Sequence, residues 1–134
     1  ENGVMVVNMN MRGSGEGNIN QYLADTIASV FGTVYTADVK GSTNRELFAS
    51  NQEDMLDTLK NNAGNLANAD LQNMMLAVAD TSTQYDGGDY IMTDDKAPVE
   101  LLGMQVIDQV IKEEVAYYKG IYEEQGLDGL LQSL

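Results

Sequence analysis

The sequence predicts an α/β protein with a small mixed sheet, a C-terminal strand hairpin within that sheet, and several helices. Three observations carry this prediction. Strand-like segments occur only within residues 1–51, and helical periodicity dominates residues 52–134. The chain of 134 residues is long enough to bury the core of one domain. No internal repeat, linker or low-complexity segment divides it, so residues 1–134 are predicted to form a single domain.

The strands are predicted from short apolar or alternating segments. The stretch "VMVVNMNM", residues 4–11, begins with four apolar residues, which predicts a strand buried on both faces, as in a parallel sheet. Residues 33–39 alternate and are rich in β-branched side chains, and residues 45–50 form a further strand candidate. The turn "KGSTN", residues 40–44, is too short for a parallel crossover and therefore predicts an antiparallel hairpin.

Helices are predicted from apolar side chains spaced three or four residues apart. The first follows Asn18, a good N-cap residue, and two more occupy residues 51–62 and 68–80. Residues 81–90 read as a loop, and the longest helix lies within residues 93–125. Asp94 or Asp95 is predicted to cap that helix, with Pro98 in its first turn.

The composition excludes several classes of function. Acidic residues outnumber basic ones 21 to 7, and a net charge of -14 opposes binding to nucleic-acid phosphates. Such a surface would suit a cationic partner such as a polyamine, although acidity alone also serves solubility. Without cysteine or histidine, the chain has no disulfide, no thiolate nucleophile, no Ser-His-Asp triad and no common zinc site. No apolar run reaches the roughly 18 residues of a membrane span and no secretory signal opens the chain, so no membrane contact and a cytoplasmic location are expected.

A glycine-rich loop between the first strand and the first helix suggests one alternative function. Gly13, Gly15 and Gly17 precede a helix N-terminus, where backbone N–H groups can bind an anion, and Asp38 lies where a ribose-binding acid is expected. However, Glu16 would repel a phosphate, and the last glycine of G-x-G-x-x-G is missing. A small nucleotide-binding domain therefore stands as an alternative to a plain strand-to-helix turn.

Four aspartates near the start of the last helix raise the question of a metal site. Asp86, Asp89, Asp94 and Asp95 could supply oxygen ligands for calcium. Their spacing does not match an EF-hand, so a solvated loop followed by a helix cap is the simpler interpretation. No metal site is predicted.

Two stretches resemble a known family. Residues 18–50, "NINQYLADTIASVFGTVYTADVKGSTNRELFAS", resemble the C-terminal half of the spermidine synthase-like polyamine aminopropyltransferases. Residues 90–103, "YIMTDDKAPVELLG", resemble the T-D-D-x-A-P-V-E segment of the longer, often membrane-fused members. The resemblance implies a methyltransferase-like, or Rossmann-like, fold. It also implies transfer of an aminopropyl group from decarboxylated S-adenosylmethionine to an amine.

The same resemblance implies that this chain is only a C-terminal portion of such an enzyme. The family's cofactor loop follows its first strand and its catalytic aspartates follow its fourth, whereas residues 4–11 correspond to the fifth. The chain is thus expected to contain no catalytic residue, to bind no cofactor by itself and to be inactive alone, while its parent uses a polyamine substrate.

Some positions still match places that line the family's amine pocket. In the family these places are the end of the fifth strand and the turn before the last strand. The corresponding residues here are Asn8, Asn10, Thr43 and Asn44. The family's usual glutamine and tyrosine-proline residues are absent at these places. Asp94 and Asp95 match the family motif without an assigned role beyond capping.

An incomplete sheet also predicts association between copies of the chain. A strand edge without a neighbour and an uncovered apolar face favour pairing, most simply as a two-fold dimer. A homo-oligomer is therefore expected. The third alternative for the whole chain is a non-catalytic acidic oligomerisation module.

Overall fold

The computed structural model describes residues 3–10 and 16–133 of the chain. These residues form two compact units, Glu1–Ala97 and Pro98–Leu134, which are described separately here. The single domain expected from the sequence stays a prediction.

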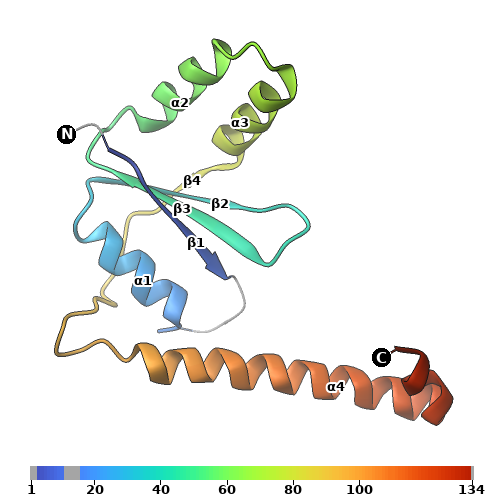
Figure 1. Ribbon diagram of the computed structural model, residues 1–134. Helices are drawn as coiled ribbons and strands as arrows, with labels where there is room; N and C mark the ends of the chain where they lie inside the picture. The colour runs from blue at the N-terminus through green and yellow to red at the C-terminus, as the bar shows by residue number, and fades with distance from the viewer. Residues whose placement is uncertain (1–2, 11–15, 134) are drawn as a thin grey trace. The chain divides into compact units, whose positions relative to one another are not determined.

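The first unit contains one four-stranded sheet, formed by β1 (Met5–Asn10), β2 (Thr33–Asp38), β3 (Asn44–Ser50) and β4 (Thr83–Gln84). The strand order is β1-β3-β2-β4, and each pair of neighbours runs antiparallel (Figure 1). The prediction of a mixed sheet is therefore wrong for the described strands. The reason is the position of β3, which lies between β1 and β2 and is antiparallel to both, so that β1 and β2 are parallel without pairing.

Helix α1 (Ile19–Ala28) connects β1 to β2 and completes a split β-α-β unit. The predicted N-cap is confirmed, because the Asn18 side-chain oxygen accepts hydrogen bonds from the backbone N–H groups of Asn20 and Gln21, at 2.9 and 3.1 Å. These bonds satisfy two of the donors that a helix N-terminus leaves open.

The predicted hairpin of β2 and β3 is also confirmed. Thr33 lies opposite Ser50 at one end, and Asp38 lies opposite Arg45 at the other. In the connecting turn the Ser42 N–H donates to the Val39 carbonyl at 3.1 Å, and Gly41 has a φ of +76°. A turn with positive φ at its third residue favours glycine at that place.

The core of this unit lies between α1 and one face of the sheet. Leu47 and Ala49 on the central strand β3 have no exposed surface. They pack in a cluster with these buried residues: Met9, Ala24, Ile27 and Val34. Side chains alternate between the two faces along a strand, so the strand residues next to these core positions point to the face of the sheet away from the core.

The prediction that residues 4–7 are buried on both faces is wrong. Val4 and Val6 are 50% and 57% exposed, because β1 is an edge strand and the described core covers only one of its faces. A continuous apolar run thus arose here without the two-sided burial that such runs usually indicate. The strand is also shorter than predicted, and Met11 lies outside the described residues.

Helices α2 (Met55–Gly64) and α3 (Ala69–Thr81) form a helical pair, as the sequence predicts (Figure 1). The Asn68 side chain caps α3 by accepting from the Leu71 N–H at 3.0 Å. Strand β4 follows α3 almost directly and pairs with β2, with Thr83 opposite Thr36. Residues 81–90, predicted as a loop, therefore include a short strand whose two residues carry no periodic pattern.

The second unit consists mainly of α4 (Val99–Ser133), which is interrupted at Gly126, where φ is +70° and ψ is -163°. The Pro98 carbonyl accepts from the Leu102 N–H at 2.9 Å, so Pro98 immediately precedes the helix. Within the described residues, no helix combines the length and the apolar character that a membrane span requires.

The prediction that Asp94 or Asp95 caps the last helix is wrong. Both residues lie in a tight turn whose ends are joined by a hydrogen bond of 2.9 Å from the Lys96 N–H to the Thr93 carbonyl. This turn ends before α4 begins at Val99, so neither carboxylate reaches the first helical N–H groups as a cap would.

Candidate functional site

The candidate site lies where β1 and β2 end. Both strands are antiparallel to β3, so their carboxyl ends meet the beginning of β3 at one edge of the sheet. Ligands of open α/β sheets bind outside the carboxyl ends of the strands. We call the residues at this edge the carboxyl-end cluster; they are Asn8, Asn10, Asp38, Thr43, Asn44 and Arg45.

The structure brings the four predicted amine-lining residues to this edge. Asn10 lies opposite Asn44, and Asn8 lies opposite Glu46, two residues further along the ladder. Asn8 and Thr43 are exposed, and Asn44 is half-buried. The Asn44 N–H donates to the Ser42 hydroxyl oxygen at 3.1 Å and holds the turn before β3 in shape. The register places Asn8 and Asn44 on the face of the sheet away from the core, whereas Arg45 and Asp38 share the face of Met9.

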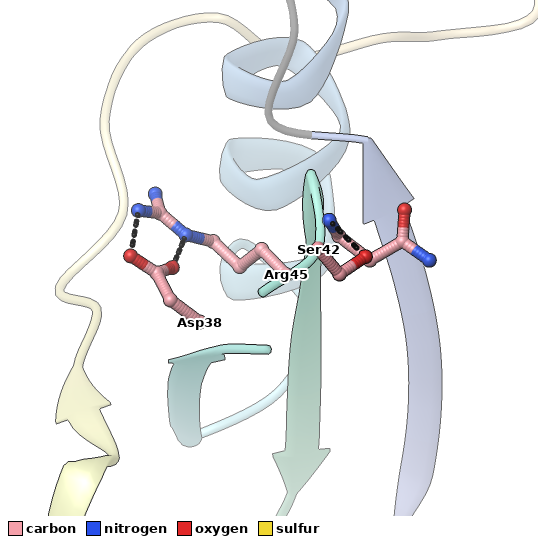
Figure 2. A network of polar contacts seen from close by, with 4 residues as sticks. Asp38, Ser42 and Arg45 are labelled. Carbon is pink, nitrogen blue, oxygen red and sulfur yellow. Dashed lines mark hydrogen bonds and ion pairs between the residues drawn. The ribbon is translucent and has the colours of Figure 1, made fainter. Parts of the chain in front are cut away.

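The strongest electrostatic feature of the cluster is an ion pair that the sequence did not single out. Figure 2 shows the Arg45 guanidinium against the Asp38 carboxylate, with Nε to Oδ1 at 2.5 Å and Nη2 to Oδ2 at 3.2 Å. These hydrogen bonds outweigh the opposing effect of burial and hold the pKa of Asp38 below its usual value. The Asp38 side chain is 58% exposed and the Arg45 side chain is 43% exposed, so the ion pair remains open to solvent.

An open groove of about 360 Å³ adjoins this ion pair. The two charged residues line it together with three hydroxyl side chains, Thr36, Thr81 and Thr83. Thr36 and Thr83 are paired across β2 and β4, so the short strand that the sequence did not predict supplies one wall.

The structure describes the glycine-rich loop only at its end, from Glu16 onward. Gly13 and Gly15 lie outside the described residues. The Gly17 N–H donates to the Gln21 side-chain oxygen at 2.8 Å, and the Asp38 carboxylate that a ribose would need is bound to Arg45. Both groups are therefore already engaged within the protein.

The aspartates considered for calcium do not form a metal site. Across residues 3–10 and 16–133, no three acidic, histidine or cysteine side chains lie together in a way that could hold a metal ion. Asp86, Asp89, Asp94 and Asp95 are all exposed.

A buried carboxylate on α1 is the polar group that the sequence analysis missed. Asp25 is 1% exposed, and it accepts hydrogen bonds from the Tyr85 hydroxyl and from the Tyr90 N–H, the latter at 3.0 Å. An aspartate beside the apolar stripe of a helix looks like a solvated residue in sequence. Only its partners, about 60 residues later in the chain, explain its burial.

Tyr85 should titrate unusually late. Loss of solvation and the hydrogen bond to Asp25 raise its pKa from 10.0 to about 12. Because the folded state holds this proton more tightly, the stabilisation is complete below pH 10 and is lost as the pH rises toward 12. The ultraviolet tyrosinate titration of Tyr85→Phe should therefore lack a late component that the wild type shows.

The hydrogen bond to Glu16 also raises the pKa of Tyr90. The contribution of Tyr85 is therefore obtained by subtracting the titration curve of Tyr85→Phe from that of the wild type. Tyr122→Phe, at an exposed position on α4, serves as the matched control and should keep the late component that Tyr85 contributes. A wild-type curve that coincides with that of Tyr85→Phe in the late region would contradict the prediction.

Comparison with known proteins supplies the family relationship. The chain is 45% identical to a probable polyamine aminopropyl transferase from Bifidobacterium longum (strain NCC 2705), in an alignment of 149 residues that includes 98% of the chain. The chain is related to part of this probable polyamine aminopropyl transferase. It spans about a third of the length of that relative, as the alignment includes 33% of it. No family model and no solved structure matches the chain.

This relationship agrees with the resemblance seen in the sequence. Identity at this level over nearly the whole chain includes both units, so the match to the transferase is not confined to the two stretches that first suggested it.

Proposed function

We propose that this chain is the C-terminal part of a polyamine aminopropyltransferase. Its parent would transfer an aminopropyl group from decarboxylated S-adenosylmethionine to an amine. The observation that carries the proposal is the 45% identity to a probable polyamine aminopropyl transferase over 98% of the chain. The split β-α-β unit supports it, because parallel strands joined through a helix are the building pattern of an α/β sheet. A partial methyltransferase-like fold is proposed on the same grounds.

Within that enzyme, the uncharged polar residues of the carboxyl-end cluster are proposed to contact the amine substrate. The amide oxygens of Asn8 and Asn44 and the hydroxyl of Thr43 can accept hydrogen bonds from an ammonium group. The Asp38–Arg45 pair lies on the other face of the sheet and is not part of the proposed amine contact. The uncharged residues would bind and orient an amine, and no step of the transfer is assigned to them.

The cofactor is proposed for the parent and not for this chain. Among the described residues, the groups expected of a cofactor loop are engaged elsewhere, since the Gly17 N–H binds Gln21 and Asp38 binds Arg45. The chain is therefore proposed to hold part of an amine pocket without the groups that react.

The proposal predicts that the chain alone forms no spermidine when it is incubated with putrescine and decarboxylated S-adenosylmethionine. The full-length protein should form it under the same conditions. In the full-length protein, Thr43→Val and Asn44→Ala should raise the KM for the amine and leave the KM for the sulfonium substrate unchanged. Lys112→Ala, on exposed helix surface, is the control.

Two outcomes would contradict this assignment. Turnover by the chain alone would place the catalytic groups within it. A full-length protein that transfers no aminopropyl group to any of several diamines would remove the proposed activity itself. The homo-oligomer and the cytoplasmic location expected from the sequence stay predictions.

A further inference from the structure

The segment after β4, residues 85–92, is attached to α1 along its length, and we call it the strap. It passes α1 in the ribbon view (Figure 1). Its first residue, Tyr85, donates its hydroxyl to Asp25, and the Tyr90 N–H donates to the other oxygen of the same carboxylate. The Met92 N–H donates to the Thr26 hydroxyl oxygen at 2.8 Å. One buried carboxylate and the next residue on α1 thus hold three points of the strap.

Two glycines let the strap come this close to the helix. A Cβ at Gly88 would lie 2.8 Å from an Asp25 carboxylate oxygen. A Cβ at Gly87 would lie 3.0 Å from the Ala28 Cβ, and Gly87 also has a φ of +79°. A larger residue at Gly88 would displace the strap or the Asp25 carboxylate, and so disturb their contact without removing any hydrogen-bonding group.

The strap continues its contacts onto the residues that precede α1. The Tyr90 hydroxyl donates to a Glu16 carboxylate oxygen at 2.9 Å. Its ring meets the Tyr22 ring edge-on, with centroids 5.0 Å apart. A Cβ at Gly17, where φ is +71°, would lie 3.1 Å from the Tyr90 ring. Residues 16–17 therefore lie directly against the strap, and we call them the loop end.

We propose that the strap and the loop end form one conformational unit, with Tyr90 as the positioning residue that couples them and buried Asp25 as its anchor. Release of the strap from α1 then frees the loop end, although the two are about 70 residues apart in the chain. A ligand or partner that displaces residues 85–92 would thereby change the conformation of the segment that leads into α1. This coupling is independent of the proposed transferase activity.

Hydrogen exchange measured by mass spectrometry on the full chain tests the coupling. Gly88→Ala disturbs the contact between the strap and Asp25, and it should accelerate exchange in peptides from both residues 85–92 and residues 16–22. Tyr90→Phe removes only the hydroxyl contact to Glu16, and it should accelerate exchange at residues 16–22 by about threefold to tenfold. Tyr122→Phe on α4 should leave both segments at the wild-type rate.

The result that overturns the proposal is an uncoupled response. If Gly88→Ala accelerates exchange in the strap while residues 16–22 keep the wild-type rate, the two segments move separately. If exchange in β3 rises as much as in the loop end, the variant has weakened the whole unit and no specific coupling exists. Should Gly88→Ala fail to fold, an unchanged loop end in Tyr90→Phe overturns the proposal by itself.

Discussion

Leu47→Ala is expected to lower the free energy of unfolding by about 2–5 kcal/mol. Leu47 has no exposed surface and lies on β3, which has a strand on each side. Truncation there removes buried methyl groups and leaves a cavity between α1 and the sheet, which rigid neighbours on two strands can fill only in part. Urea unfolding followed by circular dichroism gives the change directly.

Val6→Ala is the matched control on the neighbouring strand. Its side chain is 57% exposed, so its truncation should cost less than about 1 kcal/mol. If Val6→Ala lowers the free energy of unfolding as much as Leu47→Ala does, the outer face of β1 is buried like the core face of β3, which contradicts the one-sided core.

Asp25→Ala is expected to lower the free energy of unfolding by about 2–4 kcal/mol, because it removes the acceptor for two donors at a buried position. The loss arises from donors left without a partner rather than from lost apolar contact. The same urea titration measures it, and its pattern should differ from that of Leu47→Ala: Tyr85→Phe in the Asp25→Ala background should cost less than it does in the wild type.

Asp38→Ala provides the comparison for a carboxylate in an exposed ion pair. Such pairs contribute about 0–1 kcal/mol, and the pair with Arg45 is open to solvent on both sides. If Asp38→Ala destabilises the protein as much as Asp25→Ala does, the difference in burial between the two carboxylates does not control their contributions.

The features that could be predicted from the sequence are those fixed within a few neighbouring residues. Asn18 signals the start of α1 because its side chain bonds the next turn, and the turn of residues 40–44 determines the β2–β3 hairpin because it is too short for any other connection. The helical pair α2–α3 follows from periodicity and from an intervening Gly64.

Features that depend on distant partners could not be predicted in this way. Nothing within residues 44–50 shows that β3 inserts between β1 and β2, and the burial of Asp25 depends on Tyr85 and Tyr90. The cap assigned to Asp94 or Asp95 failed because the turn that ends at Lys96 takes up both residues before the helix begins.

In the candidate site, too, some residues could be predicted from the sequence and others depend on partners elsewhere in the chain. The resemblance to aminopropyltransferases selected Asn8, Asn10, Thr43 and Asn44, and the register of β1 and β3 brings Asn10 opposite Asn44. The Arg45 ion pair was missed because its partner, Asp38, was considered only as a ribose ligand. Two residues that face each other across a hairpin become a pair only once the register is known.

The insertion of β3 between two parallel strands also constrains the order in which the chain can fold. The β2–β3 hairpin closes a short loop, whereas the pairing of β1 with β3 joins residues about 40 positions apart and has a larger entropic cost. Strand β1 has no other partner among the described strands, so it joins the sheet only through β3, and the local hairpin is expected to form first. Pulse-labelled exchange during refolding should therefore show protection of β2 and β3 amides before those of β1, and the reverse order would contradict this sequence of events. Strand β1 would thus become ordered after β2 and β3.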